Sequence, residues 1–481
     1  MVSHYRSWLQ QTAARIQISM PIGIPTRSGL LFTLPIPKMS PLRKFLIASS
    51  CLLISSAPLS AAPGISSGPM LGPIEMREAL VWVQTDDNAI VRVVYTNAES
   101  GEKLSSLPVE TDAQRAHTAT LRLNRVKPGQ RYNYQIEING ELVPGRHEFE
   151  TPAFYHGRTP PPDFTIAVGG AHYVVEEGFE PPYQILGGGY GIFETILEAK
   201  PKLMLWLGNT AHLRESDWTS RTGYLERFSQ ARSPTDLAPL LANIPQYATW
   251  SEADYGSPLA DATYSFRQYA EDAFRAFWPQ PVTVKAMEGI GTHFRYADVD
   301  FFLLDTRSHR SDNPSGKEIS RILGREQVEW LRRELLRSKA TFKVIAAGAP
   351  ILNPADNRSH LSYAREEHTE LLQMFRNEAT SGLFFLSGGK YHGELTRLVH
   401  AGSYNIYDLT LGPLTANPRK DQDELNFFRM PGTSTFERHF ALLDFSGPEE
   451  ARELTMRIMS AEGKVIWSRT VPASELQPPE E

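Results

Sequence analysis

The pattern of hydrophobic and polar positions changes near residue 155, and the change predicts two structural regions. Between residues 73 and 155, short apolar runs alternate in part with polar positions, and turn signals such as Lys127-Pro-Gly-Gln130 and Asn139-Gly140 separate them. Short alternating runs at this spacing are typical of antiparallel strands in a β-sandwich. The predicted strands are Ala79–Val83, Ile90–Tyr95, Thr118–Leu123, Tyr132–Ile138 and His147–Thr151.

The second region, residues 163–470, combines two periodicities. Apolar runs of strand length alternate with segments in which apolar residues recur at helical spacing, as Val328, Leu331 and Leu335 do. Such alternation predicts a layered α/β domain. The predicted strands are Phe164–Val168, Leu203–Leu207, Gln246–Trp250, Val299–Leu304, Phe342–Ala347 and Leu383–Leu386, with a return to strands between His439 and Trp467. The predicted helices are Ile192–Ala199, Leu237–Leu241, Phe266–Phe277, Glu326–Arg337 and Arg365–Phe375.

Composition marks the borders of both regions. The Gly-, Ser- and Pro-rich stretch Pro63–Gly72 predicts a linker before the sandwich, and the three prolines within His156–Asp163 predict a stiff linker after it. Residues 471–481 are acidic and Pro-rich, so we expect a disordered tail there. The step Pro128-Gly129 followed by Tyr132 resembles a corner of fibronectin type III modules, so the expected N-terminal domain is fibronectin-III-like.

The first 62 residues have the features of an export signal. They carry six basic residues and no acidic one, and within them Arg43 and Lys44 precede the apolar run Phe45–Ile54 and then small residues. This order predicts a secretory signal peptide at 39–62, a true start at Met39 and a mis-called extension at 1–38. The alternatives are an uncleaved membrane anchor, for which the apolar run is short, and a lipoprotein attached through Cys51. The predicted location is secreted or periplasmic, in a bacterial envelope.

Loss of the signal changes the charge of the chain. It removes Cys51, the only cysteine, and leaves 43 of the 49 Lys and Arg residues against all 55 Asp and Glu residues. An acidic chain has no electrostatic footprint for nucleic acid. The remaining sequence has no second apolar run of membrane-spanning length, so we expect no transmembrane segment after signal removal. The sequence indicates no particular protein partner.

Candidate chemistry lies on the loops that follow the predicted α/β strands, where sites form in such domains. The motifs there are Leu-Trp-Leu-Gly-Asn-x-x-x-Leu-Arg-Glu-x-Asp-Trp (205–218), Trp-x-x-x-Asp-Tyr-Gly (250–256), Leu-Asp-Thr-Arg-x-x-Arg (304–310), Leu-Gly-x-x-Gln-x-x-Trp-Leu (323–331) and Phe-Leu-Ser-Gly-x-x-x-His-x-Glu-Leu (385–395). In this order, after a β-sandwich, they resemble the PhoD-like alkaline phosphatases of the calcineurin-like metallophosphatase superfamily. The resemblance implies an α/β/β/α metallophosphatase-like sandwich and hydrolysis of phosphoesters by two metal ions.

The resemblance also shows where this sequence departs from the family pattern. The family's loops read Gly-Ser-Cys, Gly-Asp-Asn, Trp-Asp-Asp-His-Asp and Gly-Asp-Arg-His-His. Here they read Gly169-Gly170-Ala171, Gly208-Asn209-Thr210, Trp250-Ser251-Glu252-Ala253-Asp254 and Gly388-Gly389-Lys390-Tyr391-His392. The expected site is therefore degenerate at Ala171, Asn209, Glu252, Ala253, Gly389 and Tyr391. Hard cations need anionic oxygen ligands, and one remaining carboxylate does not balance two divalent ions.

Two hypotheses for function follow. In the first, the chain is an exported pseudoenzyme that keeps the phosphatase fold and needs no cofactor. It binds an anionic or phosphorylated small ligand, or it serves as an interaction module. The ligand-binding candidates are Arg307, Lys390 and His392. For Arg307 the alternative is a structural ion pair within the Asp305–Arg307–Arg310 segment. In the second, the chain is an active phosphoesterase with a remodelled site, for which a mononuclear centre is one option, and a divalent metal (Ca, Fe, Mn or Zn). The candidate ligands of that site are His172, His212, Glu252, Asp254 and His392; the alternative reading makes them solvated or hydrogen-bonding loop residues.

Overall fold

The structure is a computed structural model of the 481-residue chain. It describes residues 62–156, 158–176, 178–180, 186–258, 260–281, 289–311, 319–378, 380–399, 403–420 and 424–478. The predicted extension at 1–38, Cys51 and all but the last residue of the predicted signal peptide lie outside the described residues. Among the described residues, no helix is long and apolar enough to cross a membrane.

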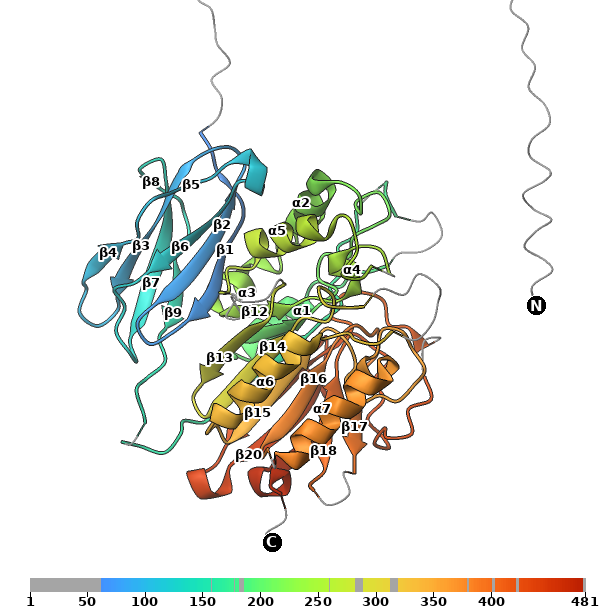
Figure 1. Ribbon diagram of the computed structural model, residues 1–481. Helices are drawn as coiled ribbons and strands as arrows, with labels where there is room; N and C mark the ends of the chain where they lie inside the picture. The colour runs from blue at the N-terminus through green and yellow to red at the C-terminus, as the bar shows by residue number, and fades with distance from the viewer. Residues whose placement is uncertain are drawn as a thin grey trace, which may run out of the picture. The chain divides into compact units, whose positions relative to one another are not determined.

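The N-terminal region is β-rich and contains two sheets (Figure 1). The three-stranded sheet has the order β1-β2-β6, and the other has the order β4-β3-β7-β8, with β5 paired to β3 and β9 paired to β7. The strands are β1 (Ile65–Ile74), β2 (Ala79–Thr85), β3 (Ile90–Asn97), β4 (Lys103–Ser105), β5 (Val109–Glu110), β6 (Thr118–Leu123), β7 (Arg131–Ile138), β8 (Glu141–Leu142) and β9 (His147–Glu150). Inward-facing side chains of both sheets, such as Val81, Val93 and Ile136, form one buried cluster, as two packed sheets require.

The predicted linker before this region is wrong. Residues 65–74 form β1, which pairs antiparallel with β2 from Ile65↔Thr85 to Ile74↔Ala79 with irregular register. Gly and Pro disfavour a regular strand, but cross-strand pairing and burial of Met70 and Leu71 outweigh the local preference. The β-rich region therefore begins about eight residues before the predicted boundary.

The α/β region contains two six-stranded sheets. One has the order β12-β11-β10-β19-β20-β21, and the other has the order β13-β14-β15-β16-β18-β17. Strands β10, β11 and β12 are mutually parallel, as are β14, β15, β16 and β18. The strands are β10 (Phe164–Gly169), β11 (Met204–Leu207), β12 (Gln246–Thr249), β13 (Thr292–Tyr296), β14 (Val299–Leu304), β15 (Phe342–Ala347), β16 (Leu383–Ser387), β17 (Glu394–Leu398), β18 (Ile406–Thr410), β19 (His439–Ser446), β20 (Glu453–Ser460) and β21 (Val465–Pro472).

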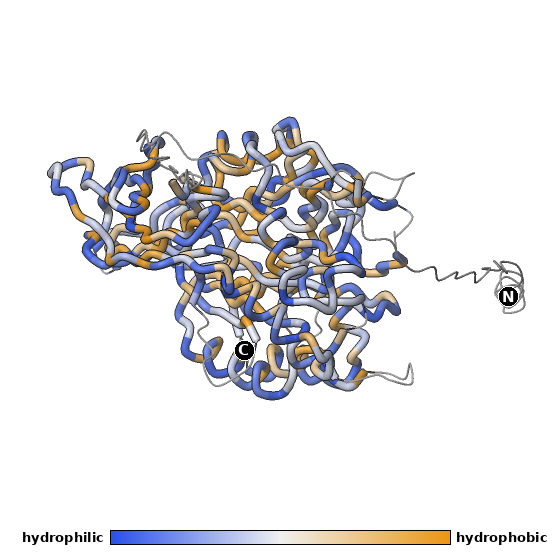
Figure 2. Tube along the Cα trace, turned by 90° about the horizontal axis from the view of Figure 1, so that it is seen from above, coloured by the Kyte–Doolittle hydropathy of each residue, from blue (hydrophilic) through white to orange (hydrophobic). Residues whose placement is uncertain are grey.

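Helices cover the two sheets. The helices are α1 (Ile192–Glu198), α2 (Arg221–Gln230), α3 (Ala238–Asn243), α4 (Glu252–Tyr255), α5 (Arg267–Phe277), α6 (Arg325–Arg337) and α7 (Arg365–Asn377). Figure 1 shows α6 and α7 across the sheet that contains β14, β15 and β16, and their residues Leu331, Leu335 and Leu371 join its buried cluster. Helices α1, α2, α3 and α5 pack with residues of the other sheet. The layers are those expected from the alternating pattern, and Figure 2 shows hydrophobic and hydrophilic stretches alternating along the trace.

Several elements differ from the prediction. Helices α2 and α4 and strands β13, β17 and β18 were not expected, because their short or polar segments carry no clear periodicity. The predicted tail is partly ordered: β21 continues to Pro472, and the turn Ala473–Leu476 follows with a fully buried Leu476. An acidic, Pro-rich composition therefore did not prevent order where an apolar side chain reaches the core.

Candidate functional site

The carboxyl ends of the parallel strands of both sheets meet at one edge of the α/β region. Thr249, at the end of β12, donates its hydroxyl to the carbonyl of Leu304, at the end of β14, at 2.8 Å. Trp250 Nε1 donates to Asp305 Oδ1 at 2.8 Å. A Cβ on Gly348 would collide with the carbonyl of Trp250, so the loops after β15 and β12 touch through their backbones. This edge carries the loops that the sequence marked as the candidate site.

Asn209 is the residue that the sequence resemblance matched to an aspartate of the family pattern. Its side chain is buried, its backbone φ is +51°, and its Oδ1 accepts a hydrogen bond from the backbone N–H of Ala253 at 3.0 Å. Its Nδ2 atom is buried and has no hydrogen-bond partner among the described residues. Unpartnered buried amide groups cost free energy, so this position is not optimised for stability alone.

Asp254, one of the candidate ligands, is a structural carboxylate. It is fully buried, and Oδ1 accepts from the backbone N–H groups of Thr210 and Ala211 at 2.7 Å, while Oδ2 accepts from that of Ser251 at 3.0 Å. Burial raises the pKa of Asp254, and these hydrogen bonds act against the rise. Oδ1 therefore joins the loop after β12 to the loop after β11, and Oδ2 stabilises the loop after β12 itself.

Gly389 is the residue that the sequence resemblance matched to another aspartate of the family pattern. Its backbone φ is +73°, a conformation that favours glycine. A Cβ at this position would lie 2.5 Å from the carbonyl oxygen of Gly348 and 3.0 Å from Ser251 Oγ. The space that a ligand side chain needs at residue 389 is thus filled by the loops after β15 and β12.

Glu252 and Arg307 form an ion pair in the same place. Arg307 Nη2 lies 2.9 Å from Glu252 Oε2, and Ser359 Oγ donates to the same oxygen at 3.1 Å. The Arg307 side chain is 5% exposed and the Glu252 side chain 29% exposed. Arg307 therefore does form an ion pair, but with Glu252 on the loop after β12 and not within the Asp305–Arg307–Arg310 segment, where the alternative placed it; Asp305 Oδ1 instead accepts from the backbone N–H of Arg307 at 2.8 Å.

Lys390 forms a second, more buried pair. Its Nζ lies 2.7 Å from Glu424 Oε1, and the other oxygen of Glu424 lies 3.0 Å from Nε2 of the buried His360. Burial raises the pKa of Glu424, but His360 and Lys390 outweigh it and hold that pKa well below its usual range. Asn357 also donates to Glu424. Glu424 is thus the centre of a charged cluster that sequence reasoning missed.

His172, His212 and Tyr391 are linked by hydrogen bonds. His172 donates from Nε2 to the carbonyl of Ala231 at 2.8 Å, and its Nδ1 lies 2.8 Å from the hydroxyl of Thr415. His212 donates from Nδ1 to the carbonyl of His172 at 2.9 Å, which leaves Nε2 to accept from Tyr391 Oη at 3.0 Å. Burial lowers the pKa of His172 to about 4 and that of His212 to about 3, so both rings are neutral near pH 7.

His392 is fully buried beside a second polar cluster, centred on Glu394. Glu394 Oε1 accepts from Asn353 Nδ2 and Asn426 Nδ2, both at 2.9 Å, and Oε2 accepts from Arg429 Nε at 2.5 Å. His392 Nε2 lies 3.9 Å from Glu394 Oε2, and its ring packs against Phe436. In the sequence, Glu394 was marked only by the Glu-Leu pair that ends the motif at 385–395. Nothing in the sequence indicated its hydrogen-bond partners.

The candidate ligands do not gather into one cluster. Ala171, which the sequence resemblance matched to a cysteine, is buried in an apolar cluster with Tyr173 and Ala416. Within the parts of the chain that the structure describes, no three His, Cys, Asp or Glu side chains come together in a way that could hold a metal ion. The structure brings together His212 with Tyr391, Glu252 with Arg307, and Lys390 with Glu424.

Comparison with known proteins agrees with the fold. The family model described as PhoD-like phosphatase matches residues 183–428, and the chain belongs to that family. A second model, described as a domain of unknown function (DUF7800), matches residues 62–156, the β-rich region with β1 included. No curated protein matches the sequence.

Two solved structures share the fold of this chain. One is titled as a structure of PhoD: it has 17% identity and a TM-score of 0.66, and the match covers 85% of this chain and 90% of that chain. The other is the purple acid phosphatase PPD1 from yellow lupin (Lupinus luteus), with 14% identity, a TM-score of 0.62 and coverage of 85% and 74%. At these identities the likeness defines a metallophosphatase fold and leaves the chemistry to the site.

Proposed function

We propose that this chain is an exported PhoD-like protein that does not hydrolyse phosphoesters by a two-metal reaction. The observation that carries the proposal is the packing at residues 209 and 389. Asn209 offers a neutral amide whose oxygen is bonded to the backbone of Ala253, and Gly389 has no room for a side chain. The residues present therefore do not fit two divalent ions, which need anionic ligands on these loops.

The charge balance of the site supports the same proposal. Two cations, Arg307 and Lys390, are paired with two carboxylates, Glu252 and Glu424, inside the protein. Buried ion pairs are stable only when their charges are mutually compensated. An anionic ligand at this edge, as predicted for Arg307 and Lys390, would have to displace Glu252 or Glu424. The geometry favours a sealed site over an open anion-binding cleft.

Export rests on the basic and apolar segment at 39–62. In this proposal the mature chain is secreted or periplasmic. The fibronectin-III-like identity of the β-rich region belongs to the proposal too: two packed antiparallel sheets support it.

The test is metal content together with hydrolysis. Elemental analysis of the purified mature chain should find well under one equivalent of Ca, Mn, Fe or Zn. Release of nitrophenol from p-nitrophenyl phosphate and bis-p-nitrophenyl phosphate should stay at background with each metal added, because ligands are missing rather than ions. Metal-dependent turnover that Glu252→Gln abolishes and the exposed control Glu366→Gln leaves intact would establish the remodelled phosphoesterase instead.

A further inference from the structure

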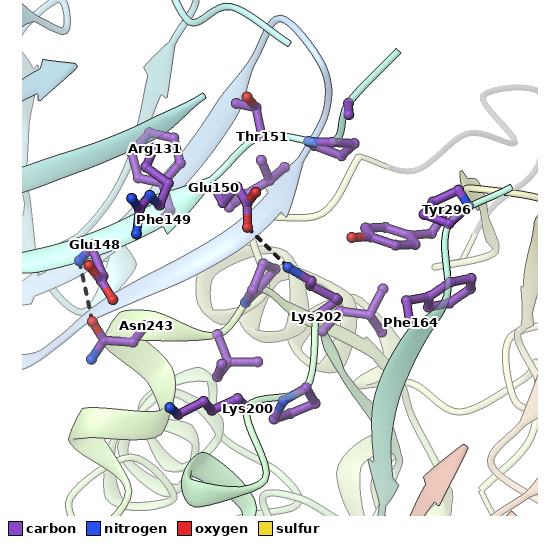
Figure 3. A pocket seen from close by; sticks show the side chains of 18 of the residues that line it. Arg131, Glu148, Phe149, Glu150, Thr151, Phe164, Lys200, Lys202, Asn243 and Tyr296 are labelled. Atoms are coloured by element: carbon purple, nitrogen blue, oxygen red, sulfur yellow. Dashed lines mark hydrogen bonds and ion pairs between the residues drawn. The ribbon is translucent and has the colours of Figure 1, made fainter. Parts of the chain in front are cut away.

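A cavity of about 360 Å³ lies between the β-rich region and the opposite edge of the α/β sheets (Figure 3). It is lined by Phe164, the first residue of β10, and by residues just before or at the start of β11 and β12, such as Leu203 and Tyr247. The candidate site described above begins after Gly169, about 17 Å further along β10 at 3.3 Å per residue. The cavity is therefore distinct from the site of the family.

The α/β side of the cavity is aromatic. Tyr247 is buried and stacks on Phe294 with 3.8 Å between the ring centroids, which fixes its orientation. Phe164 is buried and packs against Tyr296 at 4.8 Å. Figure 3 shows Phe164 and Tyr296 together on one side of the cavity. Rigid aromatic walls that are already packed from behind bind a flat ring at low cost in conformational entropy.

Two cations on the rim of the cavity form no ion pair with another described residue. Lys202 is paired with Glu150 at 3.0 Å, and Asp163 is paired with Arg452 at 2.8 Å. Within the described residues, Arg131 and Lys200 also line the cavity and form no ion pair. Glu148 also lines the cavity and forms no ion pair with another described residue. The two unpaired cations and this one unpaired carboxylate give the rim a net charge of one positive unit.

The backbone at Lys200 is an additional observation. Residue 200 has a φ of +50°, in the left-handed region where glycine is usual after a helix. A lysine there is less favourable than glycine. In Figure 3 Lys200 lies at the lower side of the cavity, below Lys202.

We infer that this cavity binds a small aromatic compound with one anionic group, a carboxylate or a phosphate. The ring lies against Tyr247, Phe164 and Tyr296, and the anion faces Lys200 and Arg131. The volume falls in the range of small-molecule sites, which are often apolar, contain a few polar groups and form where two domains meet. This inference does not depend on whether the chain hydrolyses phosphoesters.

Isothermal titration calorimetry on the mature chain tests the inference, with phenyl phosphate and benzoate as probes. At least one probe should bind, and its affinity should be about tenfold higher than the affinity of either of its parts measured alone. The parts of phenyl phosphate are inorganic phosphate and phenol, and those of benzoate are represented by acetate and benzene. The comparison between the two probes identifies the anionic group. Phenol release in the same samples reports hydrolysis separately, so failure of this inference and failure of the proposed function are distinguishable.

Variants locate the bound probe. Lys200→Gln and Tyr296→Leu should each weaken binding about fivefold or more, whereas Lys339→Gln, at an exposed lysine outside the cavity, should leave it unchanged. Thermal unfolding verifies that each variant is folded. Absence of binding of both probes up to about 10 mM overturns the inference. So does binding that Lys390→Met removes and Lys200→Gln does not, because the probe would then occupy the family site.

Discussion

Asn209, on the loop after β11, accepts a hydrogen bond through Oδ1 from the backbone N–H of Ala253, on the loop after β12, at 3.0 Å. The family pattern has an aspartate at the first position and a histidine at the second. Here the two loops are joined by a neutral hydrogen bond. A position expected to carry a metal ligand here stabilises the contact between the two loops.

Asn209→Asp should destabilise the protein. The variant has nearly the same shape but puts a carboxylate at a position that is 1% exposed and where Nδ2 has no partner. An uncompensated buried charge costs several kcal/mol, so we expect a loss of about 2–4 kcal/mol in the free energy of unfolding. Urea denaturation measures it, with the exposed Asn88→Asp as the matched control.

An increase in the stability of Asn209→Asp on addition of metal would contradict the proposed loss of the metal site. If Asn209→Asp regains its stability when Mn²⁺ or Zn²⁺ is added, and the wild type does not respond, then the loops still form a metal site. We expect no such recovery of stability, because Gly389 has no side chain and the side chain of Ala253 has no atom that can bind a metal ion.

The Lys390–Glu424 pair should show strong coupling. Lys390→Met leaves the Glu424 carboxylate without its 2.7 Å partner, and Glu424→Gln leaves the ammonium unpaired. Each single variant should lose about 3–5 kcal/mol, and the double variant should lose clearly less than the sum. A double-mutant cycle of unfolding free energies measures the coupling. Additive losses would show that the pair is not a stabilising unit.

The pH dependence of stability should reveal the buried histidines. The pKa of His172 is about 4 in the folded protein and about 6.5 in the unfolded chain. The unfolded chain therefore binds more protons between these values, and stability that is present above pH 6.5 is lost as the pH falls toward 4. For His172 the loss approaches 1.4 kcal/mol per pH unit within this window.

Comparison of His172→Gln with the wild type isolates this contribution, because other groups titrate equally in both proteins. Between pH 6.5 and about 4.5, the variant should lose roughly 2 kcal/mol less stability than the wild type. The exposed His156→Gln is the matched control. Equal slopes for the wild type and His172→Gln would show that the His172 ring is not held neutral by burial.

The mature N-terminus should lie before β1. The predicted signal peptide at 39–62 ends shortly before β1, which begins at Ile65, and the N–H of Gly64 donates to Asp86 Oδ1 at 2.8 Å. Cleavage after Gly64 would remove part of this anchor, so we expect the first residue of exported protein at or before Gly64. N-terminal sequencing of protein from the periplasm or medium checks this, and an intact Met1 in the cytosol would refute export.

The sequence determined the order and type of most elements. Strands β6, β14 and β15 have the predicted bounds, because apolar, β-branched and aromatic runs bury themselves in any layered fold. It also determined the loops of the candidate site, since motifs at strand ends keep their place when single side chains change. Family membership followed from the same motifs.

Only the tertiary structure decided what these side chains do. The partner of Lys390 is Glu424, 34 positions further along the chain, and that of Arg307 is Glu252, 55 positions before it. No local pattern encodes such pairs, because they depend on which strand ends meet. The lack of room for a side chain at Gly389 and the formation of a strand at 65–74 also depend on contacts between segments that are distant in the sequence. Backbone contacts and pairing across the fold outweighed what composition favoured locally.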